Sequence, residues 1–153
     1  MAFDIKGYEK LIDSFSRIMI KNKRIGQIRI ADDKWTLQEM VGHLIDSASN
    51  NHQRFIRLQL GTALDFPAYD AEEWRRITQI VDCDYRFVVS FWEQYNTLLL
   101  HLIRNMKESD LNNYWIKGGE NKSLGLLIDE YYKHIRWHLD LFNERIKEIK
   151  EYK

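Results

Sequence analysis

The sequence predicts an all-α protein of the four-helix-bundle class. Four long segments carry apolar residues at steps of three and four, the spacing of the buried face of an amphipathic helix. Turn-forming residues are scarce, with 7 Gly and 1 Pro among 153 residues, which argues against a turn-rich β architecture. Four such helices on a chain of this size form one core. We therefore expect residues 1–153 to be one domain, a four-helix bundle with a short extra helix in a crossover.

The first two helices are marked by polar residues at their starts and glycines at their ends. Asp4 is a candidate N-cap for a helix that runs to about Gly26. In residues 28–34, apolar and polar residues alternate only briefly, and no second such run could pair with them as a strand. We therefore expect a loop there. Thr36 and Glu39 then have the spacing of a capping box, which starts a second helix that ends near Gly61.

The second half of the chain predicts one short and two long helices. Residues 61–69 form a surface crossover, and a short helix capped by Asp70 reaches Val81. A third long helix extends from Tyr85 to Met106. Residues 109–122 are polar and contain an Asn pair and a Gly pair, so we expect a loop there. Ser123 caps the fourth helix.

Composition and charge restrict the partners of the protein. Lys+Arg and Asp+Glu both number 23, so the net charge of zero gives no sign of a nucleic-acid or anionic-membrane partner, and we expect a small-molecule substrate. No apolar stretch reaches membrane-spanning length and the start lacks a signal-peptide pattern, so we expect a cytoplasmic protein. The single cysteine, Cys83, suits a reducing compartment and is interpreted as a packing residue.

Two histidines lie on the apolar stripe of the fourth helix. His134 and His138 are four residues apart, which brings their Cβ atoms to about 5–6 Å on one helix face. Both rings can then hold one metal ion. The alternative is a pair of core histidines whose polar atoms are satisfied by hydrogen bonds to neighbours.

Helical phase separates the other three histidines. His43 is oriented toward the bundle interior, whereas His52 lies about 180° away on the same helix and His101 lies on the wet side of the third helix. Three neutral imidazoles match a divalent metal, zinc or nickel, and leave one coordination position open for water or substrate. In the metalloprotease helix motif, a glutamate that acts as general base follows the first histidine. Here Ile135 follows His134, so the helix does not supply a general base at that position.

A polar line continues along the second helix beside His43. We interpret Asn50 as a candidate catalytic residue, because a neutral amide can orient a water or a substrate carbonyl. Asp46 is a weaker candidate for a hydrogen bond to a ligating ring, because its helical phase is poor. Arg54 is expected on a solvated edge.

Several motifs occur together in an order that extends over nearly the whole chain. They are Trp35-Thr36-x-x-Glu39-x-x-x-His43-Leu44-x-Asp46-Ser47, Asn50 with Arg54-Phe55, Tyr69-Asp70-x-x-x-Trp74, Ser123-Leu124-Gly125 and His134-x-x-x-His138. In this combination the chain resembles the DinB/YfiT-like superfamily of metal-dependent enzymes, with the closest likeness to its YfiT branch. The resemblance implies a four-helix bundle in which His43, His134 and His138 are the metal ligands.

The resemblance also implies an activity. Relatives include S-transferases that join a low-molecular-weight thiol, such as bacillithiol, to electrophiles, and a mycothiol-dependent isomerase. The first hypothesis is therefore a metal-dependent transferase with a low-molecular-weight thiol as co-substrate, and Tyr69 and Trp74 are candidate pocket walls. The alternatives are a metal-dependent hydrolase of an amide or ester, a non-catalytic metal-binding stress-response bundle, and a structural bundle without metal. Many relatives are dimers, so we expect a homodimer.

Overall fold

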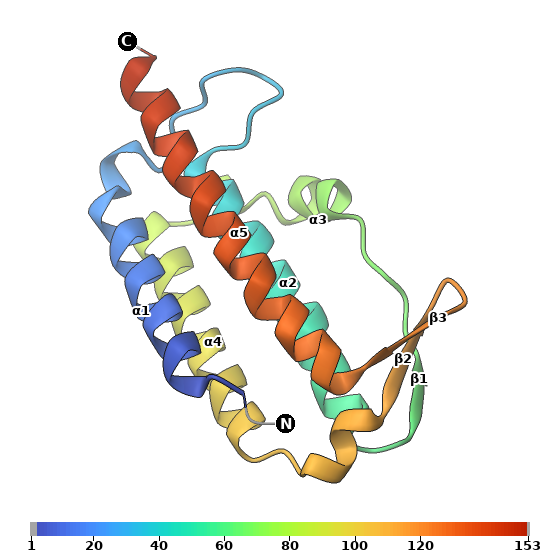
Figure 1. The fold of residues 1–153 in the computed structure, drawn as a ribbon. Helices are drawn as coiled ribbons and strands as arrows, with labels where there is room; N and C mark the ends of the chain where they lie inside the picture. Colours follow the sequence, from blue (N-terminus) through green and yellow to red (C-terminus); the bar gives the residue numbers. More distant parts are fainter. Residues whose placement is uncertain (1–2, 153) are drawn as a thin grey trace.

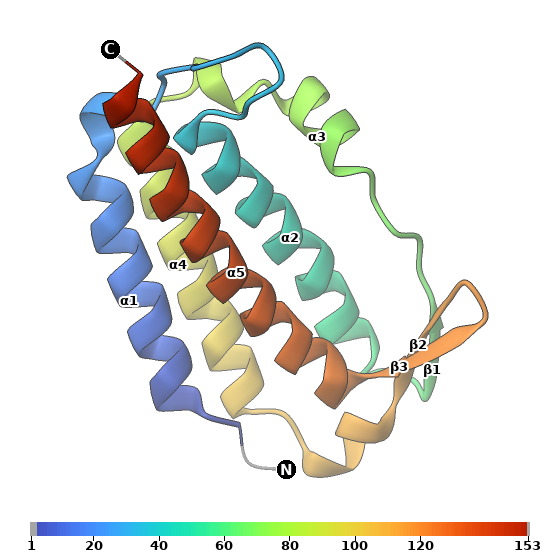
Figure 2. The same ribbon diagram turned by 45° about the horizontal axis from the view of Figure 1, so that its top comes forward.

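Four long helices form the frame of the computed structural model, which describes residues 3–152 (Figure 1). Helix α2 begins at the end of the bundle where α1 ends, α4 runs in the direction of α2, and α5 returns in the direction of α1 (Figure 2). Helices α1 and α2 each pack against both α4 and α5. The predicted four-helix bundle is confirmed, and its bounds are α1 Ile5–Lys21, α2 Leu37–Arg57, α4 Tyr85–Arg104 and α5 Leu124–Glu151.

The helix starts lie where the capping residues predicted them. The Asp4 side chain accepts a hydrogen bond from the backbone N–H of Gly7, and Ser123 accepts one from Leu126. At the start of α2 both hydrogen bonds of the capping box between Thr36 and Glu39 are present. These bonds satisfy N–H groups that have no partner inside the helix.

The helix ends come earlier than the glycines suggested. Helix α1 stops at Lys21 and continues as a short 3₁₀ helix, η1 (Lys23–Ile25). Gly26 is instead a packing residue, because a Cβ there would lie 2.4 Å from a ring carbon of Tyr85. Helix α2 likewise ends at Arg57 rather than at Gly61.

The short extra helix in the crossover is confirmed as α3 (Ala71–Thr78), capped by Asp70. A 3₁₀ turn, η2 (Ile80–Asp82), follows it after Gln79, which has a positive φ of 50°. Helix α3 packs beside the start of α2 (Figure 1). It is held there by Arg75, whose guanidinium lies 2.9 Å from the Glu39 carboxylate.

The prediction that residues 109–122 form a loop is wrong. After the 3₁₀ helix η3 (Glu108–Asn112), the strands β2 (Tyr114–Lys117) and β3 (Glu120–Ser123) form an antiparallel hairpin. Its two-residue turn is Gly118-Gly119, with φ of 58° and 84°. Two residues with positive φ match the right-handed twist of the strands, which is why such a Gly pair is a hairpin signal.

A third strand joins the hairpin from the crossover. Strand β1 (Ala63–Asp65) pairs in parallel with β2, in the register Ala63 opposite Tyr114. The predicted surface crossover is therefore tied to a segment about fifty residues further along the chain. The small sheet lies against the end of the bundle where α2 ends and α5 begins (Figure 1).

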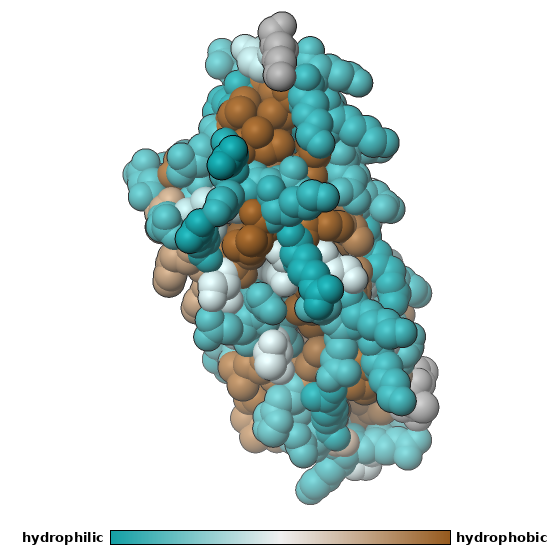
Figure 3. All heavy atoms as spheres, turned by 90° about the vertical axis from the view of Figure 1, so that its left-hand side faces the viewer, coloured by the Kyte–Doolittle hydropathy of each residue, from teal (hydrophilic) through white to brown (hydrophobic). Residues whose placement is uncertain are grey.

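Aromatic side chains fill the centre of the bundle. Trp92 and Phe142 both meet the Phe15 ring edge to face at 5.3 Å, and all three are fully buried. Figure 3 views the side on which α1 lies, where hydrophobic atoms show only as patches between hydrophilic side chains. Within residues 3–152, no helix is long and apolar enough to cross a membrane.

Candidate metal centre

Three histidines meet between the antiparallel helices α2 and α5. His43 lies two turns into α2, and His134 and His138 lie one turn apart in the middle of α5. The Nε2 atom of His134 is 3.4 Å from that of His43 and 3.0 Å from that of His138. One ligand atom from each residue lies within 4.8 Å of the other two. The structure thus brings together the three histidines that helical phase selected.

Burial keeps these imidazoles neutral at physiological pH. Desolvation, followed by repulsion from the ring of His134, lowers the pKa of His43 to about 4. The same two causes, with a contribution from His43, lower the pKa of His138 to about 3. Burial also lowers the pKa of His134. Neutral rings present an unprotonated nitrogen, which is the form that ligates a metal.

The arrangement fits a divalent cation. Bonds of 2.0–2.1 Å in a tetrahedral site put neighbouring ligand nitrogens about 3.3 Å apart, close to the two spacings between the Nε2 atoms. The Nδ1 atoms of His43 and His138 are buried without a hydrogen-bond partner among the described residues. Among the described residues, the hydrogen-bond contacts of the three rings join only their own Nε2 atoms, and none reaches the core.

Two tryptophans cover the histidines. The Trp35 ring meets His43 edge to face at 5.6 Å, and Trp137 packs on His138 at 5.0 Å between ring centroids. Trp137 is itself 58% exposed, so the centre lies near the surface of the bundle. Aromatic walls lower the local polarity and strengthen electrostatic interactions inside the site.

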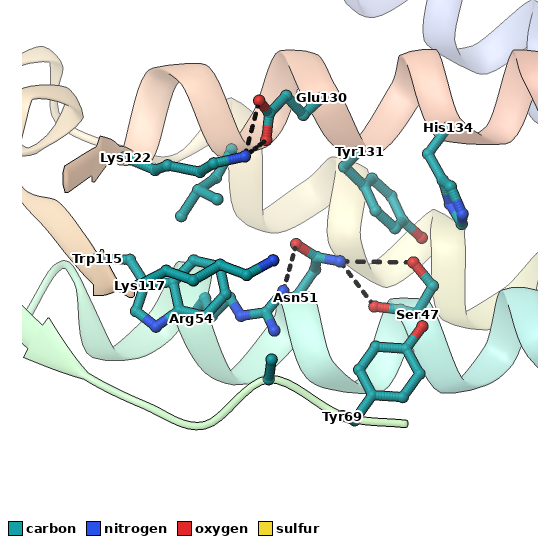
Figure 4. A pocket seen from close by; sticks show the side chains of 12 residues that line it. Ser47, Asn51, Arg54, Tyr69, Trp115, Lys117, Lys122, Glu130, Tyr131 and His134 are labelled. Carbon is teal, nitrogen blue, oxygen red and sulfur yellow. Dashed lines mark hydrogen bonds and ion pairs between the residues drawn. The ribbon is translucent and has the colours of Figure 1, made fainter. Parts of the chain in front are cut away.

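Cavities open on both sides of the histidines. One of about 360 Å³ reaches His134 and runs between α2 and α5 to the hairpin (Figure 4). The other, of about 370 Å³, reaches His138 beside Trp35 and Arg145. A small molecule therefore has access to the site from two directions.

The candidate catalytic residue Asn50 lies apart from the histidines. Its side chain is buried, and its amide donates a hydrogen bond to the backbone carbonyl of Asp46 at 2.8 Å. It lines a neighbouring cavity with Trp74 and Tyr69, and Tyr69 also lines the cavity beside His134. The catalytic role of Asn50 stays a prediction.

Two charged residues of α2 are removed from solvent, Arg54 almost completely and Asp46 in part. Arg54 is only 7% exposed, so its predicted place on a solvated edge is wrong. The central carbon of its guanidinium lies 4.0 Å from the centre of the Trp115 ring. This contact depends on the hairpin, so it could not be predicted from the pattern of α2 alone. Asp46 is half-buried, and desolvation raises the pKa of its carboxyl to about 6.

The other histidines and Cys83 occupy the expected places. His101 is exposed on α4, and His52 points away from the centre, with its Nδ1 2.9 Å from the Tyr95 hydroxyl. Cys83 is partly buried and packs against the core just before α4.

The hairpin contributes site residues that the sequence analysis did not find. Trp115 and Lys117 of β2 and Lys122 of β3 line the cavity beside His134. The signal that was available is the Gly118-Gly119 pair between two short runs, which is typical of a hairpin turn.

Three imidazoles converge inside a four-helix bundle, which is the fold that the sequence resemblance implied. The structure is similar to that of YfiT from Bacillus subtilis, described as a probable metal-dependent hydrolase with an unusual four-helix bundle topology. The TM-score is 0.72 at 18% sequence identity, over 94% of this chain and 85% of the YfiT chain. No protein-family model matches the sequence, and no curated protein matches it either. The chain thus has the fold of YfiT, as the motifs predicted.

Proposed function

We propose that this protein is a metal-dependent enzyme in which His43, His134 and His138 hold a divalent cation, zinc in the first place and nickel as the alternative. The observation that carries the proposal is the convergence of the three Nε2 atoms at 3.0 and 3.4 Å beside a cavity. Three protein ligands leave a coordination position open, which is typical of a catalytic rather than a structural site. The description of YfiT as a probable metal-dependent hydrolase supports the same assignment.

The first reaction class that we propose is transfer of a low-molecular-weight thiol to an electrophile. A metal held by His43, His134 and His138 would supply Lewis acidity and would lower the pKa of a bound thiol or water. Glu130 is the carboxylate that lines the cavity beside His134, and Lys122 holds it at 2.8 and 3.0 Å. A carboxylate in such a pair is poorly placed as a general base. A thiol, with an ordinary pKa of about 8.5, needs that base less than water does.

Hydrolysis of an amide or ester is the second candidate. Asp46 lies one helical turn from His43, and desolvation raises the pKa of its carboxyl to about 6. A general base works best when its pKa lies near the operating pH. The two reaction classes differ in whether a thiol is consumed.

Metal content is the first test of the proposal. We expect about one zinc or nickel ion per chain by elemental mass spectrometry of the tag-free protein. His134→Ala should lose the metal, because only two of the three protein ligands remain. His101→Ala is the matched control, since His101 is exposed on α4 and should leave the metal content unchanged.

Absence of metal from the wild type after incubation with excess zinc and nickel would overturn the metal-centre proposal. With the metal present, each candidate electrophile or ester is incubated with and without a small thiol. Product formed only with stoichiometric loss of thiol supports transfer, whereas product formed equally without thiol supports hydrolysis.

A further inference from the structure

The cavity beside His134 contains a buried arginine without an acidic partner. Arg54 projects into it from α2, one face of its guanidinium lies on Trp115, and its Nε is buried without a hydrogen bond (Figure 4). Its one polar contact in the part of the chain that the structure describes is a long one, 3.5 Å from Nη1 to the Asn51 Oδ1 atom. An uncompensated buried charge is strongly unfavourable, and a bound anion would offset that cost.

The other charges in the cavity do not balance Arg54. The carboxylate of Glu130 is held by Lys122, so these two residues neutralise each other. Lys117 enters from β2, and its ammonium lies 5.4 Å from the centre of the Trp115 ring, with no carboxylate within ion-pair distance among residues 3–152. Two positive charges, on Arg54 and Lys117, therefore remain unbalanced at the hairpin end of the cavity.

We infer that Arg54 and Lys117 bind the carboxylate of a small anionic substrate. The planar fork of a guanidinium matches a carboxylate, and its buried position makes the charge-assisted hydrogen bonds strong. A singly charged group suits the one buried cation, Arg54, because the other unbalanced cation, Lys117, is exposed to solvent. The inference rests on the proposed function in one respect, that the reacting end of the substrate lies at His134.

The α5 wall of the cavity offers an apolar surface to a substrate. Leu127 and Tyr131 are buried there, and Tyr131 lies between Arg54 and His134 (Figure 4). The facing α2 wall is polar, with Ser47 and Asn51. A volume of about 360 Å³ is at the small end of ligand sites and suits a compact substrate. The proposed substrate thus has a carboxylate at one end and its reacting group at the other.

The test measures the binding of matched probes to the protein by titration calorimetry. The probes are hexanoate, its neutral isostere hexanamide, and hexyl phosphate. Hexanoate should bind wild type about 10- to 100-fold more tightly than hexanamide does. Arg54→Gln should remove that preference, Lys117→Gln should reduce it, and Arg54→Lys should restore part of it.

Arg57→Gln is the matched control. Arg57 lies one turn along α2 on the exposed side, and like Arg54 it lies near an aromatic ring, 5.7 Å from the centre of Phe66. It should leave the preference for hexanoate unchanged. Arg54→Gln is compared only after its helical circular dichroism and thermal midpoint have been shown to match those of Arg54→Lys.

Two results would overturn the inference. Equal hexanoate affinity in wild type and Arg54→Gln would make Arg54 a packing residue for Trp115, and tighter binding of hexyl phosphate than of hexanoate would replace the carboxylate by a phosphate. His134→Ala separates this inference from the proposed function. Hexanoate bound through Arg54 persists in that variant, whereas hexanoate bound to the metal is lost with it.

Discussion

Single side chains connect distant parts of this fold, and Glu39 is the clearest case. Its carboxylate closes the capping box of α2 and also lies 2.8 Å from Arg29 and 2.9 Å from Arg75. Burial alone would raise its pKa, but the bonds from Arg29, the Thr36 backbone and Arg75 outweigh burial and lower it. One buried carboxylate therefore joins a loop, α2 and α3.

Replacing Glu39 by Gln should lower the free energy of unfolding by about 1–3 kcal/mol at neutral pH, because two ion pairs become weaker hydrogen bonds. Because its folded-state pKa is lowered, the contribution of Glu39 is fully present above its unfolded pKa of about 4.3 and is lost as the pH falls through the folded value. The difference between wild type and Glu39→Gln in urea unfolding should therefore shrink below about pH 4.

Asp13→Asn is the control for this prediction. Asp13 pairs with Arg17 on the exposed face of α1, where both side chains are more than half exposed. An exposed pair of this kind contributes little, so the variant should unfold like the wild type. A constant difference between Glu39→Gln and wild type from pH 7 to pH 3 would contradict the argument.

Asn50 is the residue whose predicted role most needs a kinetic test. If its amide orients a substrate or water, Asn50→Ala should lower kcat about tenfold or more at unchanged metal content. Gln53→Ala is the matched control, because Gln53 is exposed and lines the same neighbouring cavity. A normal kcat in Asn50→Ala would leave Asn50 with only its hydrogen bond to the helix backbone.

Among the elements, the hairpin has the largest consequence for the site. It carries Trp115, whose indole N–H donates to the Phe66 carbonyl at 2.7 Å and whose face supports Arg54. The strands also place Lys117 and Lys122 at the cavity. The shape of the cavity therefore depends on a turn of two glycines.

Gly119→Ala should lower the free energy of unfolding by about 1–2 kcal/mol, because Gly119 has a φ of 84° that an L side chain adopts only with strain. It should also shift the NMR resonance of the Trp115 indole N–H. Gly61→Ala is the control, since a Cβ at Gly61 meets no atom within 4 Å. Thermal unfolding of the two variants checks the prediction, and equal midpoints would argue against strain at the turn.

For the molecule as a whole, the core and the histidine cluster are separate. The central aromatic cluster of Phe15, Trp92 and Phe142 is distinct from the three histidines. We therefore expect the core to fold without metal, unlike small domains in which metal binding supplies the folding energy. The homodimer and the cytoplasmic location stay predictions.

Chelation of the metal should therefore leave the helical circular dichroism at 25 °C unchanged and lower the thermal midpoint. Free metal at about 100 times its dissociation constant adds about 2.7 kcal/mol, which corresponds to about 5–10 °C for a chain of this length. His138→Ala should show no such difference between metal-loaded and chelated samples. Loss of helical signal on chelation would make the metal structural.

Local patterns were sufficient to predict the helices and the inward face of the histidines. Apolar spacing and caps such as Thr36 and Ser123 act over a few residues, so they can be read before the chain is folded. Helical phase also selected His43, His134 and His138, although phase says which way a residue faces and not which helix lies opposite.

Contacts between distant segments decided the rest. Strand β1 finds its partner β2 about fifty residues away, and Arg54 is buried because Trp115 of that strand covers it. The local sequence of β1 does not indicate that β2 is its partner, and the sequence around Arg54 does not indicate that Trp115 covers it. Pairing and burial depend on which distant segments meet in the folded chain. The face that carries the three histidines could be predicted from the chain, whereas the charged cavity beside it exists only once the hairpin has packed against α2 and α5.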